Sequence, residues 1–285
     1  MSDYTTLFII AQHRTGSTLL KNMLDAHSNI TMAFDEMNLF EPFRKNTLDR
    51  LIGRKITSAS ELIDFIERRK IYGTFWKDFE RSGIDKYKLE LELANKPFTL
   101  ELVVETILNE LSLKWNKKIS GVKYPVHFSG YSFIKRFFPG SKVIFLTRNP
   151  KSIVASKLND SAAIMRKKGT FLRRLIYHYF VLIYFSVEYK RSIDFWSKNI
   201  DKLHLVKYEQ LVLTPEATLS KVCEFCEINY MSEMLVAEGK ASSYSTNEGK
   251  GPRTSSVNMY KASLSRFDRF LISLITSKSE KKLSV

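Results

Sequence analysis

The stretch LFIIAQHRTGSTLLKNML, residues 7–24, decides the fold. It opens with an unbroken apolar run from Leu7 to Ala11, which predicts a buried strand. From residue 15 to residue 26 the apolar side chains recur at helical spacing instead. The polar loop between them carries Gly16, whose missing side chain lets the backbone approach a ligand closely. A strand, a polar loop and a helix in this order predict a cradle for phosphate, because the N–H groups and dipole at a helix start favour an anion.

Five loop residues are therefore candidate phosphate ligands: Arg14, Thr15, Gly16, Ser17 and Thr18. The guanidinium and the three hydroxyls add donors to those of the backbone. An ordinary turn between a strand and a helix would look the same, so the loop alone leaves both interpretations open. The loop lacks the GxxxxGK[ST] pattern, and with it the lysine that reaches the β- and γ-phosphates of a nucleoside triphosphate. ATP hydrolysis is thereby disfavoured.

Three more apolar runs, Ile119–Val122, Lys142–Thr147 and Leu203–Lys207, predict further buried strands. Helical patterns lie between the strands, as in residues 99–113. This alternation predicts a three-layer α/β fold, with a central parallel sheet flanked by helices and ligands at the carboxyl ends of the strands. The sequence contains no internal repeat or low-complexity linker, so we expect one domain over residues 1–285.

The strand at residues 142–147 runs into Arg148, and a helix is predicted from Pro150. Ser156 follows Arg148 by eight residues. This spacing, from the strand end to the second turn of the helix, could bring a guanidinium and a hydroxyl to one phosphate, with the arginine as a bidentate donor. An arginine that caps its own turn is the plainer alternative for this segment alone.

Two segments together, RTGSTLL (residues 14–20) and RNPKSIVAS (residues 148–156), resemble the nucleotide-binding signatures of sulfotransferases that use 3′-phosphoadenosine-5′-phosphosulfate (PAPS). The first resembles the 5′-phosphosulfate loop and the second the 3′-phosphate motif. A later segment, LHLVKYEQLVLTPEATLSKVCEF (residues 203–225), is similar to the family's strand–loop–helix whose tyrosine faces the nucleotide, here Tyr208. The resemblance implies a P-loop-like fold and PAPS as cosubstrate without a metal. It also implies in-line transfer of a sulfuryl group to a hydroxyl of a carbohydrate, glycolipid or tyrosine-like acceptor.

The resemblance implies a carboxylate as the catalytic base. The segment RTGSTLLKNMLDAHSNI (residues 14–30) and the pair Asp35–Glu36 are more similar to tyrosylprotein and carbohydrate sulfotransferases than to the cytosolic small-molecule enzymes. The cytosolic enzymes place a histidine two residues after a strand-end lysine, where this chain has Pro125 after Lys123. In the related branches a glutamate removes the acceptor proton, so we expect Glu36 as base, with Asp35 as the alternative. The apolar neighbours of this pair strengthen a carboxylate as a base.

Two further segments receive roles from the resemblance. Lys123 resembles the lysine of the family's K-x-P segment, and with Arg14 it would oppose the negative charge that develops on the bridging oxygen during transfer. The segment NEGKGPRTSSVNMYKASL, residues 247–264, resembles the family's closing loop, in which Arg253 and Ser255 would bind the nucleotide phosphate. A plain surface loop is the alternative for this last segment.

The formal net charge of +15 favours anionic partners. Together with the basic stretch at residues 165–174, it suggests an acceptor that is acidic or membrane-associated, and we predict no nucleic-acid partner. Acceptor specificity is expected to lie in residues 38–96 and 161–191. The longest apolar stretch, Leu175 to Val187, is about half of the ~20 residues that a membrane span requires. It predicts a core helix, with peripheral membrane contact as the alternative.

The two cysteines, Cys223 and Cys226, lie in one predicted helix and imply no disulfide framework, so half-buried core cysteines are favoured over a redox pair. At the N-terminus, acidic Asp3 and a short apolar run argue against a signal peptide. We expect a stand-alone, bacterial, cytoplasmic enzyme. The oligomeric state stays open.

Two other functions compete with this interpretation. A P-loop kinase-like phosphotransferase would need Mg²⁺ and ATP and is disfavoured by the missing lysine. A non-catalytic binder of anionic glycan or lipid would keep the fold and use only the positive charge.

Overall fold

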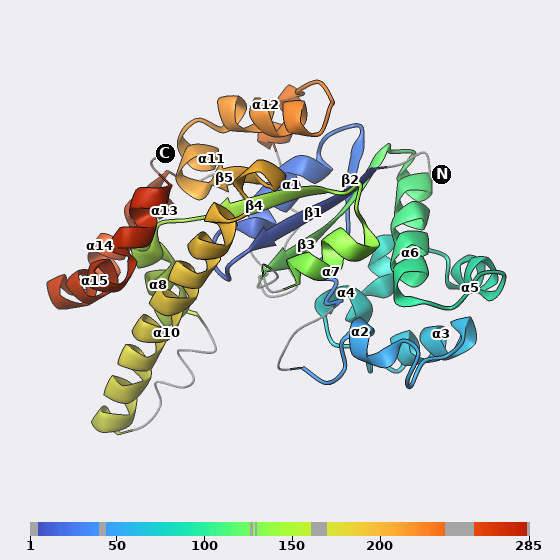
Figure 1. Ribbon diagram of the computed structural model, residues 1–285, viewed down its shortest axis with the longest axis horizontal. Coiled ribbons are helices and arrows are strands. Elements are labelled where there is room, and N and C mark those ends of the chain that lie inside the picture. Colours follow the sequence, from blue (N-terminus) through green and yellow to red (C-terminus); the bar gives the residue numbers. More distant parts are fainter. Residues whose placement is uncertain are drawn as a thin grey trace.

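The computed structural model describes residues 5–39, 44–125, 128, 130–160, 170–236 and 254–283. Within these residues five parallel strands form one sheet in the order β2–β3–β1–β4–β5 (Figure 1). The predicted α/β fold is confirmed, and each of the four predicted apolar runs is a strand. The fifth strand was not predicted, because its three residues are too few to show a pattern. The strands are β1 (Thr5–Ala11), β2 (Ile30–Met32), β3 (Ile119–Pro125), β4 (Lys142–Thr147) and β5 (His204–Lys207).

Strand β1 lies at the centre of the sheet, between β3 and β4. Its side chains alternate between the two faces, with Leu7 and Ile9 on one side and Phe8 and Ile10 on the other. All four are fully buried. A strand that is covered on both faces must be apolar throughout, which explains the unbroken run in the sequence.

The face of the sheet that carries Leu7 and Ile9 is covered by three helices and a 3₁₀ turn. Cys223 and Cys226 lie in this layer as free thiols, so the prediction of core cysteines is confirmed, although both are buried rather than half-buried. Burial raises the pKa of Cys223 to about 11 and that of Cys226 to about 12, which keeps both protonated at neutral pH. The covering elements are α1 (Ser17–Asp25), α11 (Tyr208–Leu213), α12 (Pro215–Phe225) and η3 (Ser232–Val236).

The opposite face packs against α6, α7, α8 and α10. The part of the sequence between β2 and β3 forms a group of short helices, which extends this apolar core to one side of the sheet (Figure 1). This group is α2 (Leu48–Leu51), α3 (Ala59–Glu67), α4 (Thr74–Lys77), η1 (Phe79–Ser82) and α5 (Lys86–Ala94). The helices on the sheet are α6 (Leu100–Trp115), α7 (Tyr131–Phe137), α8 (Pro150–Leu158) and α10 (Phe171–Ser197).

Helix α10 corrects one sequence prediction. The stretch 175–187 was expected to be a core helix, but only one face of it is buried. Val181 and Leu182 pack in the core, whereas Phe180 is 61% exposed and Ile183 is 51% exposed. The N-terminal half of α10 projects from the body of the protein beside α14 (Tyr260–Ser263) and α15 (Arg266–Lys282) (Figure 1). The remaining elements are η2 (Ile200–Lys202) and α13 (Ser255–Asn258).

Of the helices in the described part of the chain, none is both long enough and apolar enough to cross a membrane.

Candidate active site

The carboxyl ends of β1, β3, β4 and β5 meet at one edge of the sheet, and predicted site residues stand at each of them. Arg14 follows β1, Lys123 lies near the end of β3, Arg148 follows β4, and Tyr208 follows β5 directly. The fold thus brings together four residues that are far apart in the sequence, as expected for ligands at the carboxyl edge of a parallel sheet.

The loop after β1 has the shape of an anion-binding turn. Arg14 and Gly16 both have positive φ angles, 70° and 93°, and α1 begins at the next residue, so its free N–H groups border the loop. A Cβ at Gly16 would lie 2.3 Å from Cδ2 of Tyr208, which shows that the aromatic ring packs directly on the loop backbone. The Thr15 hydroxyl is buried and donates to the Gln12 carbonyl at 2.8 Å. Thr15 therefore has only its backbone to offer a phosphate.

Arg148 is buried against this loop. Its guanidinium donates to the Arg14 carbonyl at 3.2 Å and to the Ser256 carbonyl at 2.8 Å. The guanidinium carbon lies 4.2 Å from the centre of the Tyr208 ring, and the Tyr208 hydroxyl is 2.7 Å from Ser256 Oγ. Arg148 Nε is buried without a hydrogen-bond partner among the described residues. A buried guanidinium with a spare donor suits an anionic ligand.

Ser156 lies against the same loop, on the second turn of α8. Arg14 Nε donates to Ser156 Oγ at 3.0 Å, so the predicted phosphosulfate loop and the predicted 3′-phosphate motif are in contact. Helix α8 begins at this place because Asn149 Oδ1 accepts the N–H of Lys151 at 2.9 Å and Pro150 occupies the first turn.

Lys123 links the loop to the pair of carboxylates. Its ammonium donates to Thr18 Oγ1 at 3.1 Å. The same nitrogen lies 3.4 Å from Asp35 Oδ1 and 3.4 Å from Glu36 Oε1. Asp35 also accepts the backbone N–H of Glu36 at 2.8 Å. The Asp35 side chain is 4% exposed and the Glu36 side chain 20% exposed, so Glu36 is the carboxylate more open to a second substrate.

A model of the sulfotransferase family matches residues 6–232, which include the loop, both carboxylates, Lys123, Arg148 and Tyr208. The chain belongs to the sulfotransferase family. The family that the sequence motifs indicated is therefore confirmed.

Two solved sulfotransferase domains share the fold of this family member. The domain from the curacin biosynthetic pathway superposes with a TM-score of 0.61 at 18% identity and covers 96% of this chain and 98% of that chain. The domain from the Synechococcus PCC 7002 olefin synthase has a TM-score of 0.58 at 17% identity and covers 97% and 96%. The likeness confirms the P-loop-like architecture predicted for the sulfotransferase family.

Two protein-tyrosine sulfotransferases are similar in sequence. Protein-tyrosine sulfotransferase A of Caenorhabditis elegans is 24% identical over 231 residues, which are 80% of this chain and 51% of that protein. Protein-tyrosine sulfotransferase 1 of Danio rerio is 23% identical over 255 residues, 86% of this chain and 60% of that protein. This sulfotransferase-family chain thus spans only about half of the length of the first relative and somewhat more of the second.

The C-terminal part of the predicted site is only partly described. Arg253 lies outside the described residues, and Ser255 is the first residue of α13 with a side chain that also lies outside them. The neighbouring Ser256, which was not predicted, contacts Arg148 and Tyr208 instead. Two adjacent serines offer no sequence signal that would distinguish them. Among the described residues, no group of three or more His, Cys, Asp or Glu side chains could hold a metal ion.

His13 is a further member of the site, and the sequence did not indicate its protonation state. Burial lowers its pKa to about 4, and the charges of Lys157, Lys123 and Arg14 add to the shift. The imidazole is therefore neutral at physiological pH, and it adds no positive charge beside these three cations.

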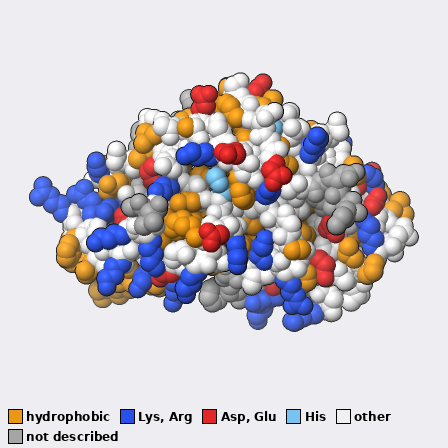
Figure 2. Space-filling view, turned by 45° about the horizontal axis from the view of Figure 1, so that its top comes forward, with side chains coloured by type: hydrophobic (Ala, Val, Ile, Leu, Met, Phe, Trp, Pro, Cys, Tyr) orange, Lys and Arg blue, Asp and Glu red, His pale blue; other side chains and the backbone are white. Residues whose placement is uncertain are grey.

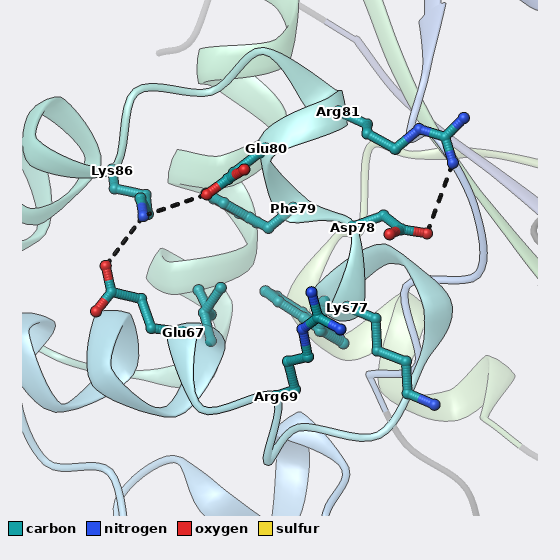
Figure 3. Close-up of a pocket in the computed structure, with 10 residues that line it drawn as sticks. Glu67, Arg69, Lys77, Asp78, Phe79, Glu80, Arg81 and Lys86 are labelled. Atoms are coloured by element: carbon teal, nitrogen blue, oxygen red, sulfur yellow. Dashed lines mark hydrogen bonds and ion pairs between the residues drawn. The ribbon is translucent and has the colours of Figure 1, made fainter.

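A hollow of about 330 Å³ opens beside α4, within the segment 38–96 that was predicted to set acceptor specificity (Figure 3). Its charged lining residues are largely paired with one another, and Figure 3 shows Lys86 between two glutamates. The backbone N–H of Phe75, in α4, donates to the carbonyl of Glu36 at 3.3 Å. The helix that borders the hollow is thus joined directly to the candidate base.

Proposed function

We propose that this chain is an enzyme that transfers a sulfuryl group from PAPS to an acceptor hydroxyl. The observation that carries the proposal is the position of Lys123, whose ammonium contacts Thr18 in the loop and Glu36 in the carboxylate pair. In-line transfer needs a base on the acceptor side, a leaving group on the donor side and positive charge close to both. The contacts of Lys123 with both the loop and the carboxylate pair support this proposal.

The donor would lie along the carboxyl edge of the sheet. The turn at Arg14 and Gly16 and the start of α1 offer backbone N–H groups to the 5′-phosphosulfate. The spare Nε of Arg148 and the nearby Ser156 hydroxyl suit the 3′-phosphate. The full set of proposed nucleotide-binding residues is Arg14, Thr15, Gly16, Ser17, Thr18, Arg148, Ser156, Tyr208, Arg253 and Ser255.

In the proposed reaction Glu36 takes the proton of the acceptor hydroxyl, and the acceptor oxygen attacks the sulfur. The bond between sulfur and the bridging oxygen breaks on the opposite side. The leaving group, 3′-phosphoadenosine-5′-phosphate (PAP), keeps the electron pair of that bond. Negative charge gathers on the bridging oxygen, where Lys123 and Arg14 stabilise it. We propose that no metal ion takes part.

Glu36 is proposed as the base and Asp35 as its support. The higher exposure of the Glu36 side chain favours proton transfer from a bound acceptor. Asp35 is enclosed and accepts from both Lys123 and the Glu36 N–H, so it orients these two residues. The opposite assignment of the two carboxylates is the alternative.

The proposed acceptor is a hydroxyl of a carbohydrate, a glycolipid or a tyrosine-like group. Two observations support this range: the similar proteins are named protein-tyrosine sulfotransferases, and the net charge of +15 favours an acidic or membrane-associated acceptor. A single domain over residues 1–285, a cytoplasmic location and the lack of a nucleic-acid partner belong to the same proposal.

Calorimetric titration with PAP, without metal and with AMP and ATP as comparison ligands, tests the donor site. The proposal requires tight binding of PAP that falls at least 30-fold in Arg148→Ala, since a charge-assisted hydrogen bond contributes about 2 kcal/mol. The matched control is Arg68→Ala, because Arg68 is an exposed arginine on the surface that pairs only locally with Asp64. This control should bind PAP as the wild type does.

Turnover of labelled PAPS with a panel of hydroxyl acceptors tests the reaction itself. Equal or tighter binding of ATP with Mg²⁺ would favour the kinase-like alternative over the sulfotransferase. PAP binding without turnover, unchanged in Glu36→Gln and Lys123→Met, would favour a non-catalytic binder of anions.

A further inference from the structure

Two parallel helices at one end of the protein expose a set of apolar side chains. Helices α10 and α15 lie side by side, because His178 Nε2 is 3.0 Å from Asp268 Oδ1 and the Tyr179 ring is 6.4 Å from the Phe267 ring. Their outer sides carry large apolar residues that are 61% to 67% exposed. These residues form what we call the α10–α15 surface: Leu172, Ile176, Phe180, Phe270 and Leu274.

The exposed charges around this surface are cationic. Arg173 and Arg174 are exposed between the apolar residues of α10, and Arg266 and Lys278 are exposed on α15. Helix α10 contains no carboxylate before Glu188. The first carboxylate of α15, that of Asp268, is buried and bound by His178 and Ser265. Figure 2 shows basic and apolar side chains gathered at the left end of the molecule, where these helices lie in Figure 1.

A surface that is both apolar and basic matches the edge of an anionic bilayer. Aromatic and aliphatic tips enter the boundary of the acyl chains, while arginine and lysine remain among the headgroups. Each basic residue near such a surface adds to the attraction through the negative potential of the lipid. A second copy of this chain is a poorer partner, because two identical cationic faces would repel each other.

The surface is connected to the candidate active site through α10. The amide of Gln12, two residues before Arg14, donates to the Phe185 carbonyl at 2.9 Å and to Glu188 Oε2 at 3.2 Å. The same helix thus carries part of the exposed apolar surface and the contact with the loop.

We infer that the α10–α15 surface docks this protein on a membrane leaflet that contains anionic lipid. The protein stays on one side of the membrane, and α10 and α15 lie against the headgroup region of that leaflet. The inference stands on the exposed side chains and charges alone, so it holds whether or not the chain transfers a sulfuryl group.

Flotation with lipid vesicles tests the inference with the full chain. The vesicles are pure phosphatidylcholine, or phosphatidylcholine in which a third of the lipid is phosphatidylglycerol. We expect binding to the anionic vesicles only, weakened by salt as the screening length falls from about 10 Å at 0.1 M to about 3 Å at 1 M. Binding should fall at least tenfold in Leu172→Ser/Ile176→Ser/Phe180→Ser and in Arg173→Glu/Arg174→Glu.

The matched control removes exposed apolar residues elsewhere. Tyr87→Ser/Leu91→Ser changes two α5 side chains that are 79% and 67% exposed, and it should bind the vesicles as the wild type does. Thermal unfolding of every variant, followed by circular dichroism, checks that each one still folds. Absence of binding to the anionic vesicles, or equal loss in the α5 variant, would overturn the inference. The inference would also be overturned if the wild type is a dimer in size-exclusion chromatography, the triple variant is a monomer, and neither protein binds the vesicles.

Discussion

The ammonium of Lys123 lies 3.4 Å from Oε1 of Glu36, in a place where the lysine side chain is 3% exposed. The proposed charge stabiliser and the proposed base are therefore paired with each other before a substrate binds. In the proposed reaction the bridging oxygen of PAPS would compete for the ammonium, and the carboxylate would become free to take the acceptor proton. Donor binding would thus activate the base.

Replacing Lys123 by methionine tests how strongly this pairing supports the fold. The variant leaves Asp35 and Glu36 close together without their shared cation, so we expect the free energy of unfolding to fall by about 3–5 kcal/mol. Urea denaturation measures it, with exposed Lys221→Met as the control. Lys123→Arg should recover much of the stability and little of the turnover. Unchanged stability in Lys123→Met would contradict the buried pairing.

The two carboxylates are expected to respond differently to neutralisation. Glu36→Gln should lower kcat by about 10²–10⁴-fold, the usual contribution of a general base, and should leave PAP affinity nearly unchanged. Asp35→Asn should mainly lower stability, because Asp35 is the enclosed member of the pair. Single-turnover rates and thermal unfolding separate the two effects. A larger loss of kcat in Asp35→Asn would make Asp35 the base.

The edge of the sheet at which ligands bind was predictable because short-range patterns determine it. Unbroken apolar runs mark the buried strands, and the polar residues that follow them mark their carboxyl ends. The contact between Arg148 and Ser256 could not be predicted in the same way. It depends on how a C-terminal segment returns over the sheet, and local periodicity holds no information about such a return.

The prediction for α10 failed in part for a related reason. Apolar residues from Leu175 to Val187 indicate burial, but hydropathy does not say whether a neighbouring element will cover every side of a helix. Here α15 covers one side, and Phe180 stays on the outside. The exposed face is the feature from which membrane docking was inferred.

Gly16→Ala should damage the loop for two separable reasons. A Cβ would lie 2.3 Å from the Tyr208 ring, and the φ angle of 93° is unfavourable for alanine. We expect PAP affinity to fall at least tenfold. Gly53→Ala is the matched control, because Gly53 has a φ angle of 74° and no atom within 4 Å of an added Cβ. Gly16→Ala/Tyr208→Ala should lose less affinity than the sum of its parts, and strict additivity would argue against the ring contact.

His13 should make stability depend on pH in a defined window. The unfolded chain binds a proton at His13 below about pH 6.5. In the folded state, burial and the nearby cations prevent protonation of His13 until the pH falls to about 4. Between these values the unfolded state holds the extra proton, so the free energy of unfolding falls as the pH is lowered. His13→Asn should lose less stability than the wild type over this window. Saturating PAP should reduce the difference, because its negative charge raises the pKa of His13. Parallel denaturation profiles of the two proteins from pH 6.5 to 4 would show that the ring titrates freely and lies outside the cluster of cations.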